Sequence, residues 1–134
     1  MFSFDTTVKL HDTDAAGLLF YGNQFKITHD AYEAFLESIG CPLLWIIDES
    51  SFFLPIVHAE ADYHLPLAVG DKLTIELTVD SISAHSFVVE YKLTNEKQAL
   101  AGRVSTVHVS IDKKTRKKII LPEKLKTNLQ KSSQ

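Results

Sequence analysis

Apolar and polar residues alternate along several stretches of the chain, with the period of a β-strand that buries one face. The pattern is clearest where Leu73, Ile75, Leu77 and Val79 are separated by polar residues, directly after a turn signal at Gly70. The stretches predicted as strands are residues 2–10, 73–79, 87–93 and 99–111. Residues 52–64 are also expected to be extended, with Pro55 near a strand start or an edge because proline cannot donate to a sheet ladder.

One stretch has the period of a helix instead. Its apolar residues recur at spacings of three, four and seven, which predicts an amphipathic helix from about Asn23 to Ser38. Gly40 supplies the stop, because glycine tolerates the left-handed conformation of a helix cap. The residues of the apolar stripe are Phe25, Tyr32, Phe35, Leu36 and Ile39.

The remaining segments carry weaker signals. Residues 43–47 are apolar but too few to assign, and residues 48–51 have the composition of a turn. Residues 120–134 are rich in lysine and are expected to form a frayed polar tail.

The order of elements is a strand, a helix and about four further strands. Packing one long helix on one face of a continuous antiparallel sheet buries both apolar surfaces. The sequence therefore predicts a single α+β domain over residues 1–134, with one long helix on a sheet of about five strands.

Composition narrows the class of protein. With 45% hydrophobic and 23% charged residues, the 134-residue chain is typical of a globular domain, and its net charge of −3 argues against nucleic-acid binding. Cys41 is the only cysteine, so no internal disulfide is possible and a reducing compartment is expected. No stretch is long and apolar enough to span a membrane, and the first residues do not read as a secretion signal. We therefore expect a cytoplasmic protein without a membrane partner.

The candidate chemistry lies in residues 11–23, which carry Asp12, Asp14, Gly17 and Gly22 directly before the predicted helix. The first N–H groups of a helix lack intrahelical acceptors, and the helix dipole is positive there, so a substrate oxygen that gains negative charge is stabilised. A carboxylate a few residues upstream could reach the carbon that carries this oxygen. The alternative is that the two aspartates only shape the loop as Asx turns.

Residues 12–25 together with the following helix resemble the signature of the hotdog-fold acyl-CoA thioesterases of the 4-hydroxybenzoyl-CoA thioesterase type. The resemblance extends through residues 54–59 and 83–87, and it weakens after about residue 112. These later segments are most similar to the branch that hydrolyses 1,4-dihydroxy-2-naphthoyl-CoA on the route to menaquinone or phylloquinone. Ala15 departs from the proline of some relatives, which should affect the rigidity of the loop more than its chemistry.

The resemblance implies a mechanism. Asp14 matches the active-site aspartate of the family, which acts either as a nucleophile through a mixed anhydride or as a base for water, and both routes stay open. The backbone N–H of Tyr21 would polarise the thioester carbonyl, while Asp12 stays structural. A thiol with a pKa of about 8.5 leaves easily, so a strong general acid is dispensable and one carboxylate with the helix N-terminal amides would suffice. We expect no metal and no organic cofactor.

Further residues are assigned to the substrate. Gly17 and Gly22 would allow close approach of the backbone, or merely turn the chain. A planar aromatic acyl group needs flat apolar walls and a few hydrogen-bond partners. Candidates for this role are Phe20, Phe25, His58 and His85, although either histidine could equally be a polar residue at a strand end.

Two clusters invite other interpretations. His58, Glu60, Asp62 and His64 would share one face of a strand, yet they include no tight ligand pair, so we expect a solvated face and no metal. The basic residues 113–118 are either a solvated turn or a site for the phosphates of CoA. The residues proposed for the phosphates are Lys113, Lys114 and Arg116, with Arg103 as a further candidate if it reaches the same rim.

Several functions remain open beside an aromatic acyl-CoA thioesterase. They are a broad-specificity or short-chain aliphatic thioesterase, a hotdog hydratase that uses His58 with Glu60, and a non-catalytic acyl-CoA-binding module. A thin sheet covered on one face favours self-association. Relatives pair their sheets edge to edge, so we expect a dimer or tetramer in which a second subunit completes the site around Asp14.

Overall fold

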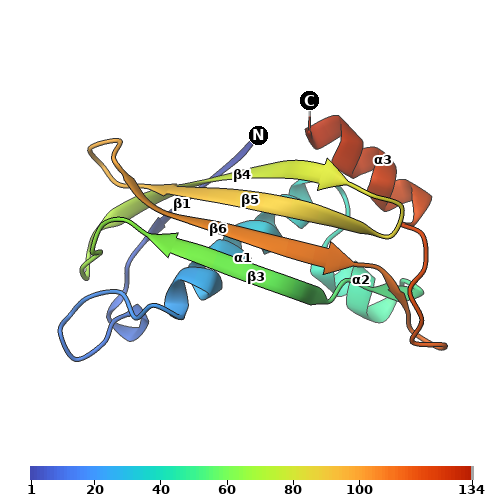
Figure 1. The fold of residues 1–134 in the computed structure, drawn as a ribbon, viewed down its shortest axis with the longest axis horizontal. Helices are drawn as coiled ribbons and strands as arrows, with labels where there is room; N and C mark the ends of the chain where they lie inside the picture. The colour runs from blue at the N-terminus through green and yellow to red at the C-terminus, as the bar shows by residue number, and fades with distance from the viewer. Residues whose placement is uncertain (134) are drawn as a thin grey trace.

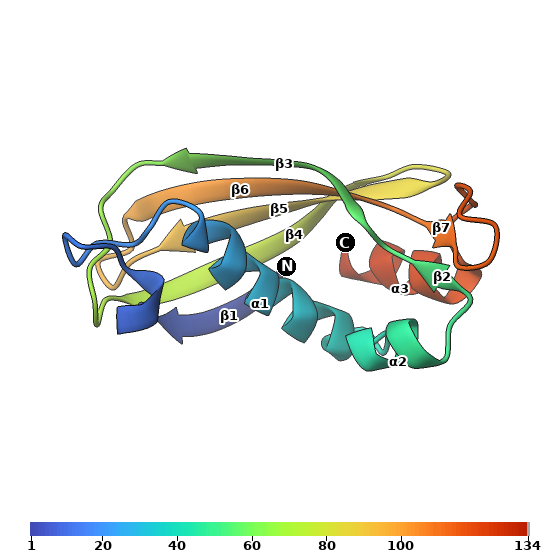
Figure 2. The same ribbon diagram turned by 90° about the horizontal axis from the view of Figure 1, so that it is seen from below.

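The computed structural model describes residues 1–133 as an α+β domain, which confirms the predicted class. A long helix, α1 (Asn23–Ser38), lies across one face of a five-stranded antiparallel sheet in the order β1-β4-β5-β6-β3 (Figure 1, Figure 2). The strands of this sheet are β1 (Phe2–Thr7), β3 (Ile56–Tyr63), β4 (Lys72–Ile82), β5 (Ser86–Thr94) and β6 (Leu100–Val109).

Helix α1 has the predicted bounds at both ends. Gly40 takes the left-handed conformation, with φ of 77°, and its N–H donates to the Glu37 carbonyl at 3.1 Å. The N–H of Cys41 reaches back to the Leu36 carbonyl at 2.9 Å, so the last turn of the helix is capped by the backbone.

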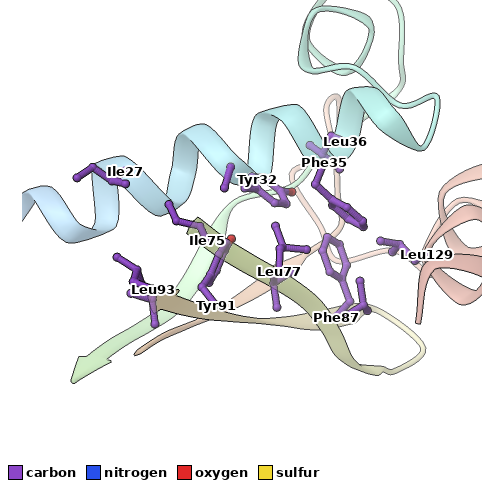
Figure 3. Close-up of a cluster of buried hydrophobic side chains, with 14 of the residues drawn as sticks. Ile27, Tyr32, Phe35, Leu36, Ile75, Leu77, Phe87, Tyr91, Leu93 and Leu129 are labelled. Carbon is purple, nitrogen blue, oxygen red and sulfur yellow. The ribbon is translucent and has the colours of Figure 1, made fainter. Parts of the chain in front are cut away.

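The core forms where the apolar stripe of α1 meets the inward side chains of β4 and β5 (Figure 3). Phe35 of the helix and Phe87 of the sheet are both at most 2% exposed. Complete burial of a side chain of this size contributes about 2 kcal/mol, which makes this layer the main source of stability. The other core residues labelled in the close-up are Ile27, Tyr32, Leu36, Ile75, Leu77, Tyr91, Leu93 and Leu129.

The opposite face of the sheet is polar. On β6, Val104 and His108 are buried toward the helix, whereas Arg103 is exposed on the other face. The register continues this outer face onto β3 through the pairs of Glu60 with Ser105 and of Asp62 with Arg103. A polar face of this kind is stable in water and gives no reason for self-association. Of the features that favour self-association, only the unpaired edge of the sheet remains.

The segments whose sequence gave no clear signal of secondary structure form short helices and strands. Residues 43–47 belong to a helix, α2 (Leu43–Asp48), and residues 10–12 form a 3-10 helix, η1 (Leu10–Asp12). The extended segment 52–64 is two strands, because β2 (Phe52–Phe53) leaves the main sheet before Pro55 and pairs with β7 (Ile111–Asp112).

The predicted polar tail is wrong for the described residues. Residues Glu123–Ser132 form helix α3, in which Leu125 and Leu129 are completely buried. These two residues are four positions apart and therefore share one face, while the lysines occupy the others. Residue 134 lies outside the described part of the chain. Within residues 1–133, no helix combines the length and apolar character needed to cross a membrane.

Two lysines hold helix α2 in place. The ammonium group of Lys113 donates to the carbonyls of Ile46, Ile47 and Ser50 at 2.6, 2.9 and 2.6 Å, which satisfies the C-terminal end of this short helix. From α3, the ammonium group of Lys124 lies 4.5 Å from the centroid of the Trp45 ring.

His108 is buried between two aromatic rings. Its ring lies 4.4 Å from that of Tyr32 and 4.9 Å from that of Phe87, and its Nε2 is 2.8 Å from Thr106 Oγ1. Burial lowers the pKa of His108 to about 4, the nearby His29 also lowers it, and the Leu54 backbone works in the opposite direction. The imidazole is therefore neutral in the folded protein at neutral pH.

This depressed pKa predicts acid destabilisation between pH 6.5 and pH 4. In this window an unfolded His108 binds a proton and the folded one does not, so its contribution is complete above pH 6.5 and is lost as the pH falls to about 4. The free energy of unfolding should fall by about 3 kcal/mol across the window. Urea titrations at several pH values measure it, with His108→Gln as the control. An unchanged pH slope in that variant would contradict the assignment.

Candidate active site

The loop of residues 13–22 lies at one end of the sheet, directly before α1 (Figure 2). The N–H of Leu19 donates to the Leu67 carbonyl at 2.6 Å, and Leu18 forms an isolated bridge with Ala68. The N–H of Phe20 donates to the Asp12 carbonyl at 3.0 Å and closes the loop on itself. The loop is therefore fastened at its base and along one side.

Asp14 lies exposed at the turn of this loop. Its Oδ1 accepts the N–H groups of Ala16 and Leu18 at 2.9 and 3.3 Å, and Gly17 takes a left-handed conformation with φ of 76°. Asp14 therefore forms the Asx turn that was the structural alternative to a catalytic role. Among residues 1–133 the other oxygen, Oδ2, accepts no hydrogen bond, so the turn orients the carboxylate and leaves one oxygen for chemistry.

Asp12 differs from Asp14 because it is buried and paired. Its Oδ2 accepts the N–H of Lys9 at 2.9 Å, and its Oδ1 accepts the ammonium group of Lys26 at 2.9 Å. Burial opposes ionisation of the carboxyl, but the Lys9 amide and Lys26 outweigh it and lower the pKa of Asp12. One oxygen of Asp12 therefore closes the turn at Lys9 and the other ties the base of the loop to α1, so both have a structural role.

The chain enters α1 through Tyr21 and Gly22. Among residues 1–133, neither the N–H of Tyr21 nor the N–H of Gly22 donates to a protein acceptor. Gly22 has helical dihedrals, with φ of −67° and ψ of −25°, so its N–H points out of the helix N-terminus along the axis. This end of the helix offers two free donors to an oxygen that gains negative charge.

Gln24 anchors the first turn of α1 to the sheet. Its side chain is 1% exposed, and its Nε2 donates to the carbonyls of Asp62 on β3 and Arg103 on β6 at 3.1 and 3.3 Å. A Cβ at Gly102 would lie 2.8 Å from Gln24 Nε2 and 2.9 Å from the Asp62 carbonyl. Only glycine at position 102 leaves room for this amide.

The two phenylalanines assigned to the substrate lie at this end of the molecule. Phe20 is 45% exposed, and its ring lies 4.7 Å from that of Tyr21. A Cβ at Gly22 would approach the Phe20 ring to 3.1 Å, so glycine allows this packing. Phe25, in the first turns of α1, is partly buried against the core.

The assigned histidines do not lie beside Asp14 in the same chain. His58 is near the start of β3 and faces the outer side of the sheet, with Nε2 3.9 Å from Glu60 Oε1. Tyr63, at the other end of β3, reaches the loop, so His58 is about 17 Å away along the strand. His85 lies in the turn between β4 and β5, again at the far end. Within one chain these two side chains therefore do not meet the loop, and their assignment to the substrate stays a prediction.

The basic turn also lies at the far end of the sheet (Figure 1). Lys114 and Arg116 are exposed, and the Arg116 guanidinium lies 5.0 Å from the Phe53 ring centroid. Lys113 is committed to the three carbonyls of the α2 end and is a poor phosphate ligand. Arg103 is near the start of β6, whereas the basic turn follows its end, so within one chain they do not share a rim.

A groove of about 550 Å³ opens beside this turn, between α1, α2 and the β2–β3 connection. Its walls are mostly apolar, which suits an apolar or aromatic group. Its lining includes His29, Tyr32, Leu36, Ile46, Ile47, Phe53, Leu54, Pro55, Ile56 and Arg116.

Among residues 1–133, no group of three or more histidine, cysteine, aspartate or glutamate side chains is arranged to hold a metal ion. His64 follows the end of β3, and its N–H donates to the Ala101 carbonyl at 2.9 Å. It therefore lies one residue beyond the strand that carries His58, Glu60 and Asp62.

Sequence reasoning missed three residues that shape the loop: Gln24, Tyr63 and Gly102. Gln24 was a polar residue among the apolar ones of a helix, and Gly102 was a glycine inside a strand pattern, which often marks close backbone approach. Tyr63 carried no signal, because its partner, the Tyr21 carbonyl, is 42 residues away.

The chain is similar to known proteins over almost its whole length. The model of the thioesterase-like superfamily matches residues 8–129. A 1,4-dihydroxy-2-naphthoyl-CoA hydrolase from Synechococcus elongatus is 38% identical over 130 residues, covering 96% of this chain and 95% of the relative.

Solved structures of thioesterases superpose on nearly the whole chain. A 1,4-dihydroxy-2-naphthoyl-CoA thioesterase from Synechocystis superposes with a TM-score of 0.90 and 37% identity, over 96% of this chain and 94% of the other. A gentisyl-coenzyme A thioesterase superposes with a TM-score of 0.85 and 25% identity, over 95% of this chain and 98% of the other.

Proposed function

The chain belongs to the thioesterase-like superfamily and has its hotdog fold, and we propose that it hydrolyses 1,4-dihydroxy-2-naphthoyl-CoA to the free acid and CoA. The relative from Synechococcus elongatus carries this activity in its name, at 38% identity over almost the full length of both chains. The observation that carries the proposal is the loop, which combines an oriented carboxylate at Asp14 with two free N–H groups at the start of α1.

These groups supply what hydrolysis of a thioester needs. The N–H of Tyr21 donates to the thioester oxygen and stabilises its negative charge as the tetrahedral intermediate forms. Asp14 either attacks the carbonyl carbon, giving a mixed anhydride that water then cleaves, or takes a proton from the attacking water. In both routes the C–S bond breaks, CoA leaves as the thiol, and water supplies the acid oxygen.

The other candidate functions have less support. A hydratase would use His58 with Glu60, but this pair is exposed on the outer face of the sheet, about 17 Å along β3 from the loop. A broad-specificity or aliphatic thioesterase would use the same loop and differ only in the acyl pocket. The gentisyl-coenzyme A relative also acts on an aromatic thioester, which favours an aromatic acyl group. Within this proposal the product enters menaquinone or phylloquinone synthesis in the cytoplasm.

We further propose that the protein is a dimer or a pair of dimers, joined through β3. This strand is at the edge of the sheet, and its Ile56, Val57 and Tyr63 are 42%, 60% and 48% exposed. An unpaired edge with exposed apolar side chains favours pairing with a second copy.

Such a dimer would bring the two ends of the sheet together. When two copies of β3 pair antiparallel about a two-fold axis, the end of one strand faces the start of the other. Tyr63, which contacts the loop, would then lie beside Ile56 of the second copy, which lines the apolar groove. The acyl group would bind in that groove, and Lys114 and Arg116 of the second copy would lie near enough to reach the phosphates of CoA.

Replacing Asp14 by asparagine tests the catalytic carboxylate. Asparagine keeps the Oδ1 acceptor of the Asx turn, so Asp14→Asn should fold normally and lose at least about 100-fold in kcat. Stopped-flow or thiol-trapping assays measure the release of CoA. Tyr21→Phe is the matched control, because only its backbone N–H is used, and its kcat should stay within about threefold. An Asp14→Asn enzyme within tenfold of wild type would remove Asp14 from the mechanism.

A substrate panel tests the acyl group. We expect kcat/KM for 1,4-dihydroxy-2-naphthoyl-CoA to exceed that for a short and a long aliphatic acyl-CoA by at least tenfold, equal to about 1.4 kcal/mol of transition-state preference. 4-Hydroxybenzoyl-CoA should fall between them, because it fills less of an aromatic pocket. If either aliphatic thioester is preferred tenfold, the naphthoyl assignment is wrong while the thioesterase assignment stands.

Subunit mixing tests the shared site. Ile47 is 60% exposed on the rim of the groove, so Ile47→Trp should fold and block the groove. Asp14→Asn and Ile47→Trp should each be inactive alone, and refolding them together should restore about a quarter of wild-type activity, because each mixed dimer then has one intact site. No recovery, when co-purification of differently tagged chains shows mixed dimers, would place Asp14 and the groove of one chain in the same site.

A further inference from the structure

Tyr63 makes a long-range hydrogen bond although half of its side chain is exposed to solvent. It is the last residue of edge strand β3, and its side chain remains 48% exposed. Its hydroxyl nevertheless donates to the carbonyl oxygen of Tyr21 at 2.8 Å, across 42 residues of sequence. The end of β3 thus reaches the entry to α1 (Figure 2).

The bonded carbonyl belongs to the same peptide unit as the N–H of Gly22. A peptide unit is planar, so a hydrogen bond that fixes the Tyr21 oxygen also fixes the direction of the Gly22 N–H. A carbonyl that accepts a hydrogen bond is polarised, which makes the N–H of its own peptide a stronger donor. This N–H has no acceptor among residues 1–133 and points out of the helix.

The remaining contact of the Tyr21 carbonyl is weaker. The N–H of Gln24 reaches it at 3.4 Å, which is long for an N–H···O bond. The side chain of Gln24 holds the first turn of α1 to β3 and β6 from below, through the Asp62 and Arg103 carbonyls. Gln24 therefore fixes the turn, and Tyr63 is the main group that fixes the peptide preceding it.

From this geometry we infer that Tyr63 is a positioning residue of the hydrolytic site: its hydroxyl orients and polarises the Tyr21–Gly22 peptide, so that the Gly22 N–H donates to the thioester oxygen together with the Tyr21 N–H. The inference rests on the proposed function. Tyr63 does not touch the reacting atoms and transfers no proton.

The ionisation state of Tyr63 is consistent with a pure donor role. Burial of the hydroxyl and the neighbouring Tyr21 both raise the pKa of Tyr63 above its ordinary value. The phenol is therefore protonated, and able to donate, at every pH at which the enzyme would work.

Tyr63→Phe tests the inference by removing one oxygen atom. The ring is half exposed and stays in place, so the melting temperature and the dimer mass should be unchanged within error. We expect kcat for the preferred acyl-CoA to fall about tenfold, equal to about 1.4 kcal/mol, with KM within twofold, because the lost interaction is made mainly in the transition state. The shape of the pH profile of kcat should be unchanged.

Wild type and Asp14→Asn are assayed beside it. A Tyr63→Phe enzyme with wild-type kcat, with a change confined to KM, with a shifted pH profile, or with a melting temperature lowered in step with kcat would overturn the positioning role. If wild type hydrolyses no acyl-CoA, the proposed function fails and the inference fails with it. If wild type is active and Tyr63→Phe keeps its kcat, only the inference fails.

Discussion

The position of the reactive loop depends on one constraint, the attachment of the first turn of α1 to the backbone of the sheet. The amide of Gln24 occupies the space above Gly102 and bridges the carbonyls of Asp62 and Arg103. Each of these buried hydrogen bonds contributes about 1 kcal/mol to the free energy of unfolding, which is less than the core contributes. Both bonds, however, fix the geometry of a single helical turn. The free N–H groups and the loop ahead of them take their positions from that turn.

The elements with a regular period were readable from the sequence. The bounds of α1 follow from an apolar stripe and from Gly40, and the strands follow from strict alternation at positions such as Leu73 to Val79. Helix α3 was missed because Leu125 and Leu129 give too short a stripe among many lysines to compete with the signal of a polar tail. Its burial is decided by contacts with the sheet, which no local pattern records.

The sequence locates the part of the candidate site that is contiguous along the chain, and it cannot show which distant segments the topology brings near it. The loop, Asp14 and the helix start occupy adjacent residues, so the motif contains them. His58 and His85 were assigned to the substrate because the resemblance covers their segments, yet within one chain the start of β3 and the β4–β5 turn lie at the end of the sheet away from the loop. The length of β3 also separates the loop, which Tyr63 contacts, from the apolar groove, which Ile56 lines.

The contact of Lys124 with Trp45 on helix α2 has a practical consequence for following the protein in solution. Trp45 is the only tryptophan of the chain, and it is held between the Lys124 ammonium group and the Phe52 ring, 6.0 Å away. Its helix also forms one wall of the groove through Ile46 and Ile47. Intrinsic fluorescence therefore has one emitter, and its wavelength and its quenching by the nearby cation report the position of that wall without any attached dye.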